Sequence, residues 1–88
     1  MLDAPEDTDV WDIPLGKYRH YKTGKLYQVI GFALHSEAYE EMVIYKALYN
    51  CPKFGNNRIW VRPKRMFLEE VSHDGQMIQR FQLTEFMD

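Results

Sequence analysis

The stretch GKYRHYKTGKLYQVIGFALH, residues 16–35, decides the fold. Two runs rich in aromatic and β-branched residues, 17–22 and 25–34, flank the dipeptide Thr23-Gly24. A two-residue connection that ends in glycine is typical of a tight β-hairpin turn. Gly31 interrupts the second run, and a glycine inside a strand usually marks a bulge or a sharp bend. The stretch therefore predicts a bent antiparallel hairpin.

The expected register of this hairpin bears on a metal site. Pairing Lys22 with Lys25 places His20 opposite Tyr27, close to the turn, because facing residues keep a constant index sum. His35 then lies about 25 Å farther along an unbent strand, at ~3.3 Å per residue. Two histidines so far apart cannot share one ion, and we expect neither a metal site nor a cofactor.

Further strand-like runs follow at residues 43–49, 58–62, 67–71 and 77–83, with turn residues between them. Pro63 ends one run, residues 64–67 then fit a single helical turn, and an Asp-Gly pair at 74–75 predicts a second hairpin. Five to six short antiparallel strands with a one-turn helix near 63–67 predict an all-β fold. We expect a small Src-homology-3-like barrel, and an OB-type barrel is the alternative.

Length and composition limit the organisation of the chain. Its 88 residues suffice for one core, and 45% of them are hydrophobic, which favours a folded domain. Residues 1–12 are acidic and predict a flexible N-terminal arm, followed by a single β-barrel domain at 13–88. A net charge of −2 gives no overall attraction to nucleic acid or to an anionic membrane.

Targeting signals are absent from the sequence. It lacks the basic start and apolar run of a signal peptide, and no stretch approaches the ~20 apolar residues of a membrane span. Cys51 is the only cysteine, so an intramolecular disulfide cannot form. We therefore expect a cytoplasmic protein with no membrane partner. An exposed edge strand would allow a monomer or a weak dimer.

Polar side chains converge at one predicted rim. Pairing Tyr49 with Arg58 sets Arg62 beside Tyr45, and a guanidinium next to aromatic rings can clamp a phosphate or carboxylate while a ring stacks on the ligand. This pattern favours a non-catalytic binding module for a small anionic ligand or a peptide end. The expected ligand-binding residues are His35, Ser36, Glu37, Tyr45, Trp60 and Arg62.

Other interpretations of the same residues stay open. Arg62 could instead pair with Glu37 or Glu41 as part of the structure, with Tyr45 and Trp60 in the core. A one-residue slip in register would turn Arg62 outward. Whether Arg62 belongs to a binding site or to a structural ion pair is thus undecided by the sequence.

Two rival functions come from other classes. A nucleic-acid module, binding RNA, could use the basic and aromatic stretch 58–67, with contacts from Arg58, Lys64 and Arg65. A small enzyme could use His35 and Glu37 as an acid–base pair. The sequence offers no glycine elbow for Ser36 and no phosphate-binding glycine loop, so we assign no catalytic residue.

From Gly16 to about Leu83 the sequence resembles a bacterial family of small proteins known only as a domain of unknown function. The resemblance rests on the segments GKYRHYKTGKLYQVIGFALHSE (16–37), VIYKALY (43–49), IWVRPKRMF (59–67) and the DG…RF pairs at 74–75 and 80–81. It implies a Src-homology-3-like barrel and supplies no activity. It also implies a signature set of His20, His35, Ser36, Glu37, Tyr45, Trp60 and Arg62.

Overall fold

The computed structural model describes residues 13–86, and the arm predicted at 1–12 lies outside this range. The described chain is mainly β-structure, so the all-β class is confirmed. The single described helix is the one predicted after Pro63. The elements are β1 (Gly16–His20), β2 (Leu26–Leu34), β3 (Glu41–Ala47), β4 (Asn50–Cys51), β5 (Gly55–Asn56), β6 (Ile59–Pro63), α2 (Lys64–Phe67), β7 (Glu70–His73), β8 (Gln76–Gln79) and β9 (Phe81–Phe86).

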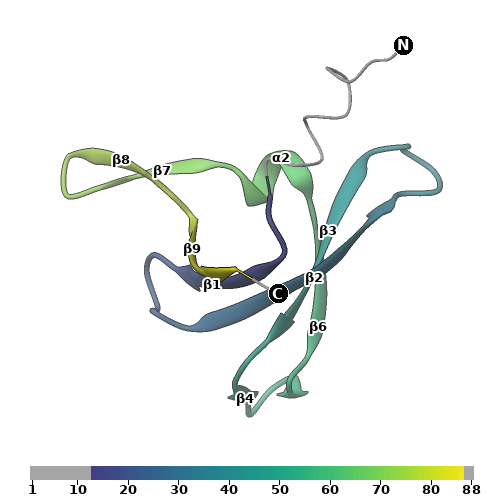
Figure 1. Cartoon of the computed structure of the whole chain (residues 1–88), viewed down its shortest axis with the longest axis horizontal. Coiled ribbons are helices and arrows are strands. Elements are labelled where there is room, and N and C mark those ends of the chain that lie inside the picture. Colours follow the sequence, from purple (N-terminus) through teal and green to yellow (C-terminus); the bar gives the residue numbers. More distant parts are fainter. Residues whose placement is uncertain (1–12, 87–88) are drawn as a thin grey trace.

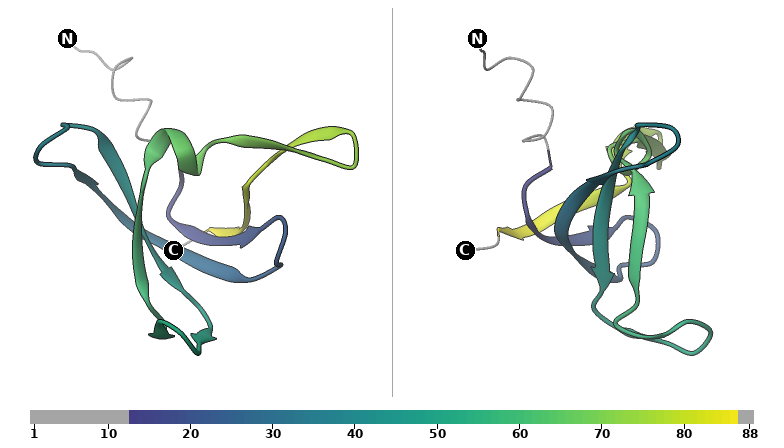
Figure 2. Two further views of the ribbon diagram at one scale, coloured as in Figure 1. Left: turned by 180° about the vertical axis from the view of Figure 1, so that it is seen from behind. Right: turned by 90° about the vertical axis from the view of Figure 1, so that its right-hand side faces the viewer.

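Five strands form one antiparallel sheet in the order β6-β3-β2-β1-β9, and two small hairpins, β4–β5 and β7–β8, stand apart from it (Figure 1). The sheet is strongly bent, but its edge strands β6 and β9 do not pair with each other, so the barrel is not closed (Figure 2). Between β6 and β9 the chain forms α2 and the projecting β7–β8 hairpin.

The β1–β2 hairpin has a longer turn than predicted. Tyr18 lies opposite Tyr27, and Gly16 opposite Val29, two residues away from the expected register. The connection closes through the amide of Gly24, which donates to the carbonyl of His20 at 2.9 Å, and Gly24 has φ +73. A shift of two residues keeps every side chain on its predicted face, because side chains alternate with period two.

The bend predicted at Gly31 is confirmed as a bulge. Val29 lies opposite Tyr45 and Gly31 opposite Ile44, so Ile30 is an extra residue with no partner of its own in β3. Such a bulge increases the local twist of a strand. It lets β2 curve from its pairing with β1 into its pairing with β3.

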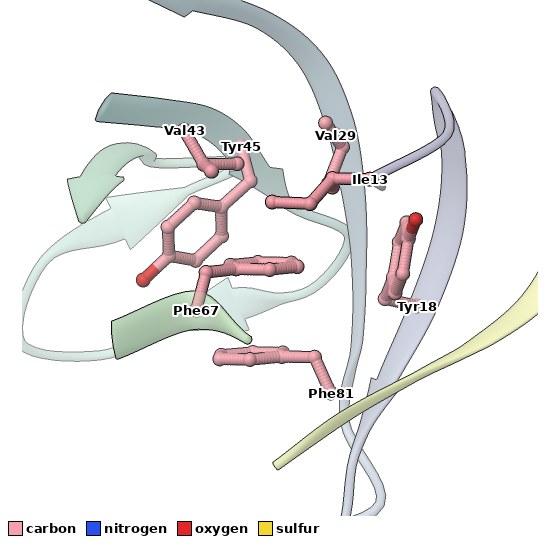
Figure 3. Packing of buried hydrophobic residues seen from close by; sticks show 7 residues of the cluster. All are labelled: Ile13, Tyr18, Val29, Val43, Tyr45, Phe67 and Phe81. Atoms are coloured by element: carbon pink, nitrogen blue, oxygen red, sulfur yellow. The ribbon is translucent and has the colours of Figure 1, made fainter. Parts of the chain in front are cut away.

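The core lies on the concave side of the sheet and is dominated by aromatic rings (Figure 3). Phe67 of α2 stacks on Phe81 of β9, with ring centroids 4.4 Å apart and planes nearly parallel. Tyr45 meets both of these rings edge-on at 5.5 and 5.6 Å. Phe67 of α2 and Phe81 of β9 therefore pack together against Tyr45 of β3. The buried cluster comprises Ile13, Tyr18, Val29, Val43, Tyr45, Phe67 and Phe81.

Candidate functional site

The candidate site is an aromatic pocket of about 190 Å³ formed by three neighbouring strands of the sheet. We use the name aromatic pocket for the space lined by Tyr27 of β2, Tyr45 of β3 and Trp60 and Arg62 of β6. These side chains share a face because Trp60 lies opposite Tyr45, and Arg62 two residues farther along the same strand. The structure thus brings together three of the six predicted site residues.

The register of β6 differs from the prediction without changing its faces. Arg62 lies opposite Val43, and Trp60 opposite Tyr45, each two residues from the expected partner. Ile59 and Val61 are more than half exposed, while the side chains that alternate with them turn inward. The one-residue slip that would have turned Arg62 outward did not occur.

Aromatic contacts define the shape of the pocket. Tyr27 meets Tyr45 edge-on at 5.5 Å, and Phe54 from the β4–β5 hairpin meets Trp60 edge-on at 5.1 Å. The guanidinium carbon of Arg62 lies 5.4 Å from the ring centroid of Phe81. The pocket is therefore walled by rings and has a single cation, held by the face of another ring.

The phenol of Tyr27 is kept neutral. Its hydroxyl shares a 2.6 Å hydrogen bond with the hydroxyl of Tyr49. Burial, and then this hydrogen bond, raise the pKa of Tyr27 above its ordinary value. The pocket consequently offers no negative charge of its own to Arg62 near neutral pH.

Within residues 13–86, Arg62 forms no ion pair with a carboxylate. The structural partners considered from the sequence are engaged elsewhere, because Glu41 pairs with Lys64 at 3.3 Å and Glu37 lies near His35. A partly buried cation without a counter-charge is uncommon, since desolvation of a charge is costly unless it is compensated. Chemically, such a pocket can hold an anion next to a planar or apolar group.

The predicted site residues His35, Ser36 and Glu37 lie outside the aromatic pocket, in the exposed loop after β2. Their polar atoms organise this loop. His35 Nδ1 accepts hydrogen bonds from the amides of Glu37 at 3.2 Å and Ala38 at 3.1 Å, and Ser36 Oγ donates to Glu37 Oε1 at 2.8 Å. Because Arg62 lies opposite Val43, and Val43 opposite Phe32, the loop begins beyond the end of the pocket.

The predicted nucleic-acid residues are placed on the surface and are mostly neutralised. Arg58 is exposed, at the start of β6. Lys64 donates to Glu41, and Arg65 donates through Nε to Glu40 Oε2. Lys64 and Arg65 are thus paired with carboxylates at the start of β3.

Sequence reasoning missed one residue that lines the pocket and a ring that contacts Arg62. Tyr27 was expected opposite His20 and was not assigned to the site, although its alternation with the buried Val29 indicates an inward-facing side chain. Phe81, which contacts Arg62, could not be placed, because its position depends on the distant pairing of β9 with β1. His20 lies opposite Phe81 in that pairing, and their ring centroids are 5.2 Å apart.

The environment of His20 favours the neutral imidazole and one of its two tautomers. Its Nδ1 accepts a 3.1 Å hydrogen bond from the amide of Lys22. Burial, and then the positive charges of Arg80, Arg62 and Lys22, lower the pKa of His20 below its ordinary value. The neutral ring therefore carries its proton on Nε2.

A second pocket, of about 200 Å³, lies between the start of the described chain and β9. Ile13, Tyr18, Phe67 and Leu83 contribute to it, and none of its lining side chains is charged. It lacks a group that could anchor a polar ligand by charge. In the described part of the chain, no three His, Cys, Asp or Glu side chains cluster as metal ligands would. No helix of residues 13–86 is long and apolar enough to cross a membrane.

Comparisons with known proteins agree on one family. The sequence profile described as "Protein of unknown function (DUF1653)" matches residues 16–83. The crystal structure of a DUF1653 protein from Bordetella bronchiseptica is similar, with a TM-score of 0.74 and 31% sequence identity. The match covers 89% of this chain and 95% of that chain. No curated protein matches the sequence.

Proposed function

The chain belongs to the DUF1653 family of unknown function, and we propose that it is a non-catalytic binding module whose ligand occupies the aromatic pocket. The ligand carries an anionic group beside a planar group. One observation carries the proposal: Arg62 is partly buried among aromatic rings and has no carboxylate partner within residues 13–86. A ligand anion would supply the missing counter-charge.

The other lining residues suit the planar part of such a ligand. Trp60 and Tyr45 present ring surfaces from adjacent strands, and Tyr27 completes the third side. Stacking against rings tolerates many planar groups, while the fork of a guanidinium selects for oxygen anions. A cationic ligand is disfavoured, because Arg62 would repel it.

Three small probes test this function: benzoate and phenyl phosphate, which combine a ring with an anion, and benzyl alcohol, which has the ring alone. In two-dimensional NMR spectra, the two anions should shift signals of Tyr27, Tyr45, Trp60 and Arg62. Benzyl alcohol should bind at least about tenfold more weakly, a difference of ~1.4 kcal/mol.

Two variants give the matched comparison. Arg62→Gln should lose the shifts caused by the anions, whereas Arg19→Gln should keep them, because Arg19 is exposed on β1 and lies outside the pocket. The proposal fails if neither anion perturbs the pocket, or if Arg62→Gln binds them as well as the unaltered protein does.

A nucleic-acid module and a small enzyme are less well supported by the geometry. The cations Lys64 and Arg65 are paired with Glu41 and Glu40, which lowers the charge they can offer to phosphates. His35 Nδ1 is occupied by loop amides. Cytoplasmic location, based on the single cysteine, and a monomeric or weakly dimeric state belong to the proposal as well.

A further inference from the structure

We infer that His20, Arg62 and Arg80 form an anion subsite around Phe81, and that the anionic group of the ligand is a phosphate monoester attached to an aromatic ring. This inference rests on the proposed function, since it names the ligand class of the aromatic pocket. It adds two residues, His20 and Arg80, that do not line the pocket itself.

His20 and Arg62 come from different strands and both contact the ring of Phe81, and Arg80 precedes Phe81 in the chain. His20 ends β1 and meets Phe81 edge-on at 5.2 Å, while the guanidinium carbon of Arg62, from β6, lies 5.4 Å from the same ring centroid. Arg80 directly precedes Phe81, and its carbonyl accepts from the amide of Tyr21, the residue after His20, at 2.9 Å. The β1–β9 pairing thus sets His20 beside the backbone of Arg80, and the contact of Arg62 with Phe81 brings the third residue to the same ring.

Positive charge exceeds negative charge at this place. Among the ion pairs of residues 13–86, Glu69 is the only carboxylate paired with any of the three, and it contacts Arg80 at 3.0 Å. Arg80 Nε is buried and has no hydrogen-bond partner within the described chain. Burial, and then the charges of Arg80, Arg62 and Lys22, lower the pKa of His20. An anion bound here would relieve this repulsion.

The number and spread of the donors favour phosphate over carboxylate. One guanidinium suffices for a planar carboxylate, which accepts a bidentate pair. A phosphate monoester has three acceptor oxygens and about −1.5 to −2 charges at pH 7. It can accept from Arg62, from Arg80 and from Nε2 of His20 at once. The attached ring would then extend into the aromatic pocket, whose cation is Arg62.

Binding of the phosphate monoester should change the protonation of His20. In the free protein the ring is neutral at pH 7, because burial and the charges of Arg80, Arg62 and Lys22 oppose its protonation. A dianion next to Nε2 favours the imidazolium instead. Binding of the phosphate monoester is therefore coupled to uptake of a proton by His20, and affinity should rise as the pH falls toward about 6.5, the ordinary pKa of histidine.

The experiment compares phenyl phosphate with benzoate, which share a ring and differ in the anion. Dissociation constants of both, measured by calorimetry, should differ by at least about tenfold in favour of phenyl phosphate. In His20→Gln and Arg80→Lys this preference should fall to about twofold, with benzoate affinity retained. Arg19→Gln, which removes a positive charge from the exposed side of β1, should keep the full preference.

A second readout separates a binding role of His20 from a structural one. Saturation with phenyl phosphate should raise the NMR titration midpoint of His20, whereas benzoate should raise it less. Equal affinities for the two probes, or a midpoint of His20 unmoved by phenyl phosphate, would overturn the subsite. If benzoate still binds and depends on Arg62, the proposed function stands without the subsite. If neither probe binds, both proposals fall.

Discussion

At the scale of single residues, Arg62 is the side chain whose environment departs most from expectation. Partly buried cations usually have carboxylate partners, but within residues 13–86 Arg62 has none and contacts the ring of Phe81. A cation over an aromatic ring contributes about 0.5–2 kcal/mol. Arg62 therefore adds little to stability, which leaves its charge available for a ligand.

Replacement of Arg62 tests this view of its energetics. Arg62→Met keeps much of the apolar stem and removes the charge, so we predict a change of about 1 kcal/mol or less in the free energy of unfolding, measured by urea denaturation. Breaking a buried ion pair would cost about 3–5 kcal/mol instead. A loss of that size would show that Arg62 has a structural partner.

The pKa of His20 predicts a pH dependence of stability. Because its pKa is lowered in the folded protein, the unfolded chain binds more protons around pH 6.5, and folding free energy contributed by the neutral ring is lost as the pH falls through that value. We expect a lower melting temperature at pH 5.5 than at pH 7.5. The His20→Gln variant should lose part of this difference, and an identical pH response in the variant would contradict the assignment.

Residue faces were predictable from the sequence, whereas partners were not. Tyr45, Trp60 and Arg62 were expected on one face, and they share it despite two-residue shifts in register. Faces depend only on alternation along a strand, but partners depend on turn geometry, as at Gly24. His35 was expected at the same rim as Arg62, but the register of β2 with β3, which alternation alone does not fix, sets Phe32 opposite Val43 and leaves His35 in the loop beyond β2.

At the scale of elements, the pairing of β1 with β9 sets His20 opposite Phe81, the ring that the guanidinium of Arg62 contacts. Turn residues predicted α2 and the Asp74-Gly75 hairpin, because these signals are local. The break between β8 and β9 at Arg80 had no local signal, since it is imposed by the pairing of Phe81 with β1.

Gly16 is a residue of β1 that lies directly against the backbone of β9. A Cβ at this position would collide with the carbonyl oxygen of Glu85, and its φ of +152 is unfavourable for other residues. We predict that Gly16→Ala lowers the free energy of unfolding by more than about 1 kcal/mol.

Gly31→Ala is the matched control. A Cβ there meets no atom within 4 Å, so the change should stay within about 1 kcal/mol. Urea denaturation of both variants measures the difference. Equal effects of the two substitutions would mean that the β1–β9 approach does not constrain Gly16.

At the scale of the whole molecule, the four-residue helix α2 packs against the inner side of an open, strongly bent sheet whose last strand, β9, comes from the end of the described chain. Phe67 and Phe81 stack in the middle of this arrangement and join the two (Figure 3). A small domain has only about 5–15 kcal/mol of total stability. The aromatic core and the pocket share Tyr45, and Phe81 of the core contacts Arg62 of the pocket, so the site is part of the structure that keeps the sheet folded.

Loss of the central ring should therefore be severe. Phe67→Ala should cost about 3–5 kcal/mol, which corresponds to a fall of roughly 12–40 °C in melting temperature for a domain of this size. The control is Phe86→Ala. Phe86 is 68% exposed at the end of β9, so its replacement should change the free energy of unfolding by less than about 0.5 kcal/mol. A small effect of Phe67→Ala would indicate that α2 does not hold the core together.

The location of a bound ring is the most direct test of the aromatic pocket as a binding site. Intermolecular nuclear Overhauser effects from phenyl phosphate should reach the side chains of Tyr27, Tyr45 and Trp60, and should disappear in Arg62→Gln. Contacts from the phenyl ring to Tyr18 and Leu83 instead would place the ligand in the uncharged second pocket. That result would contradict the assignment of the site to Arg62 and its surrounding rings.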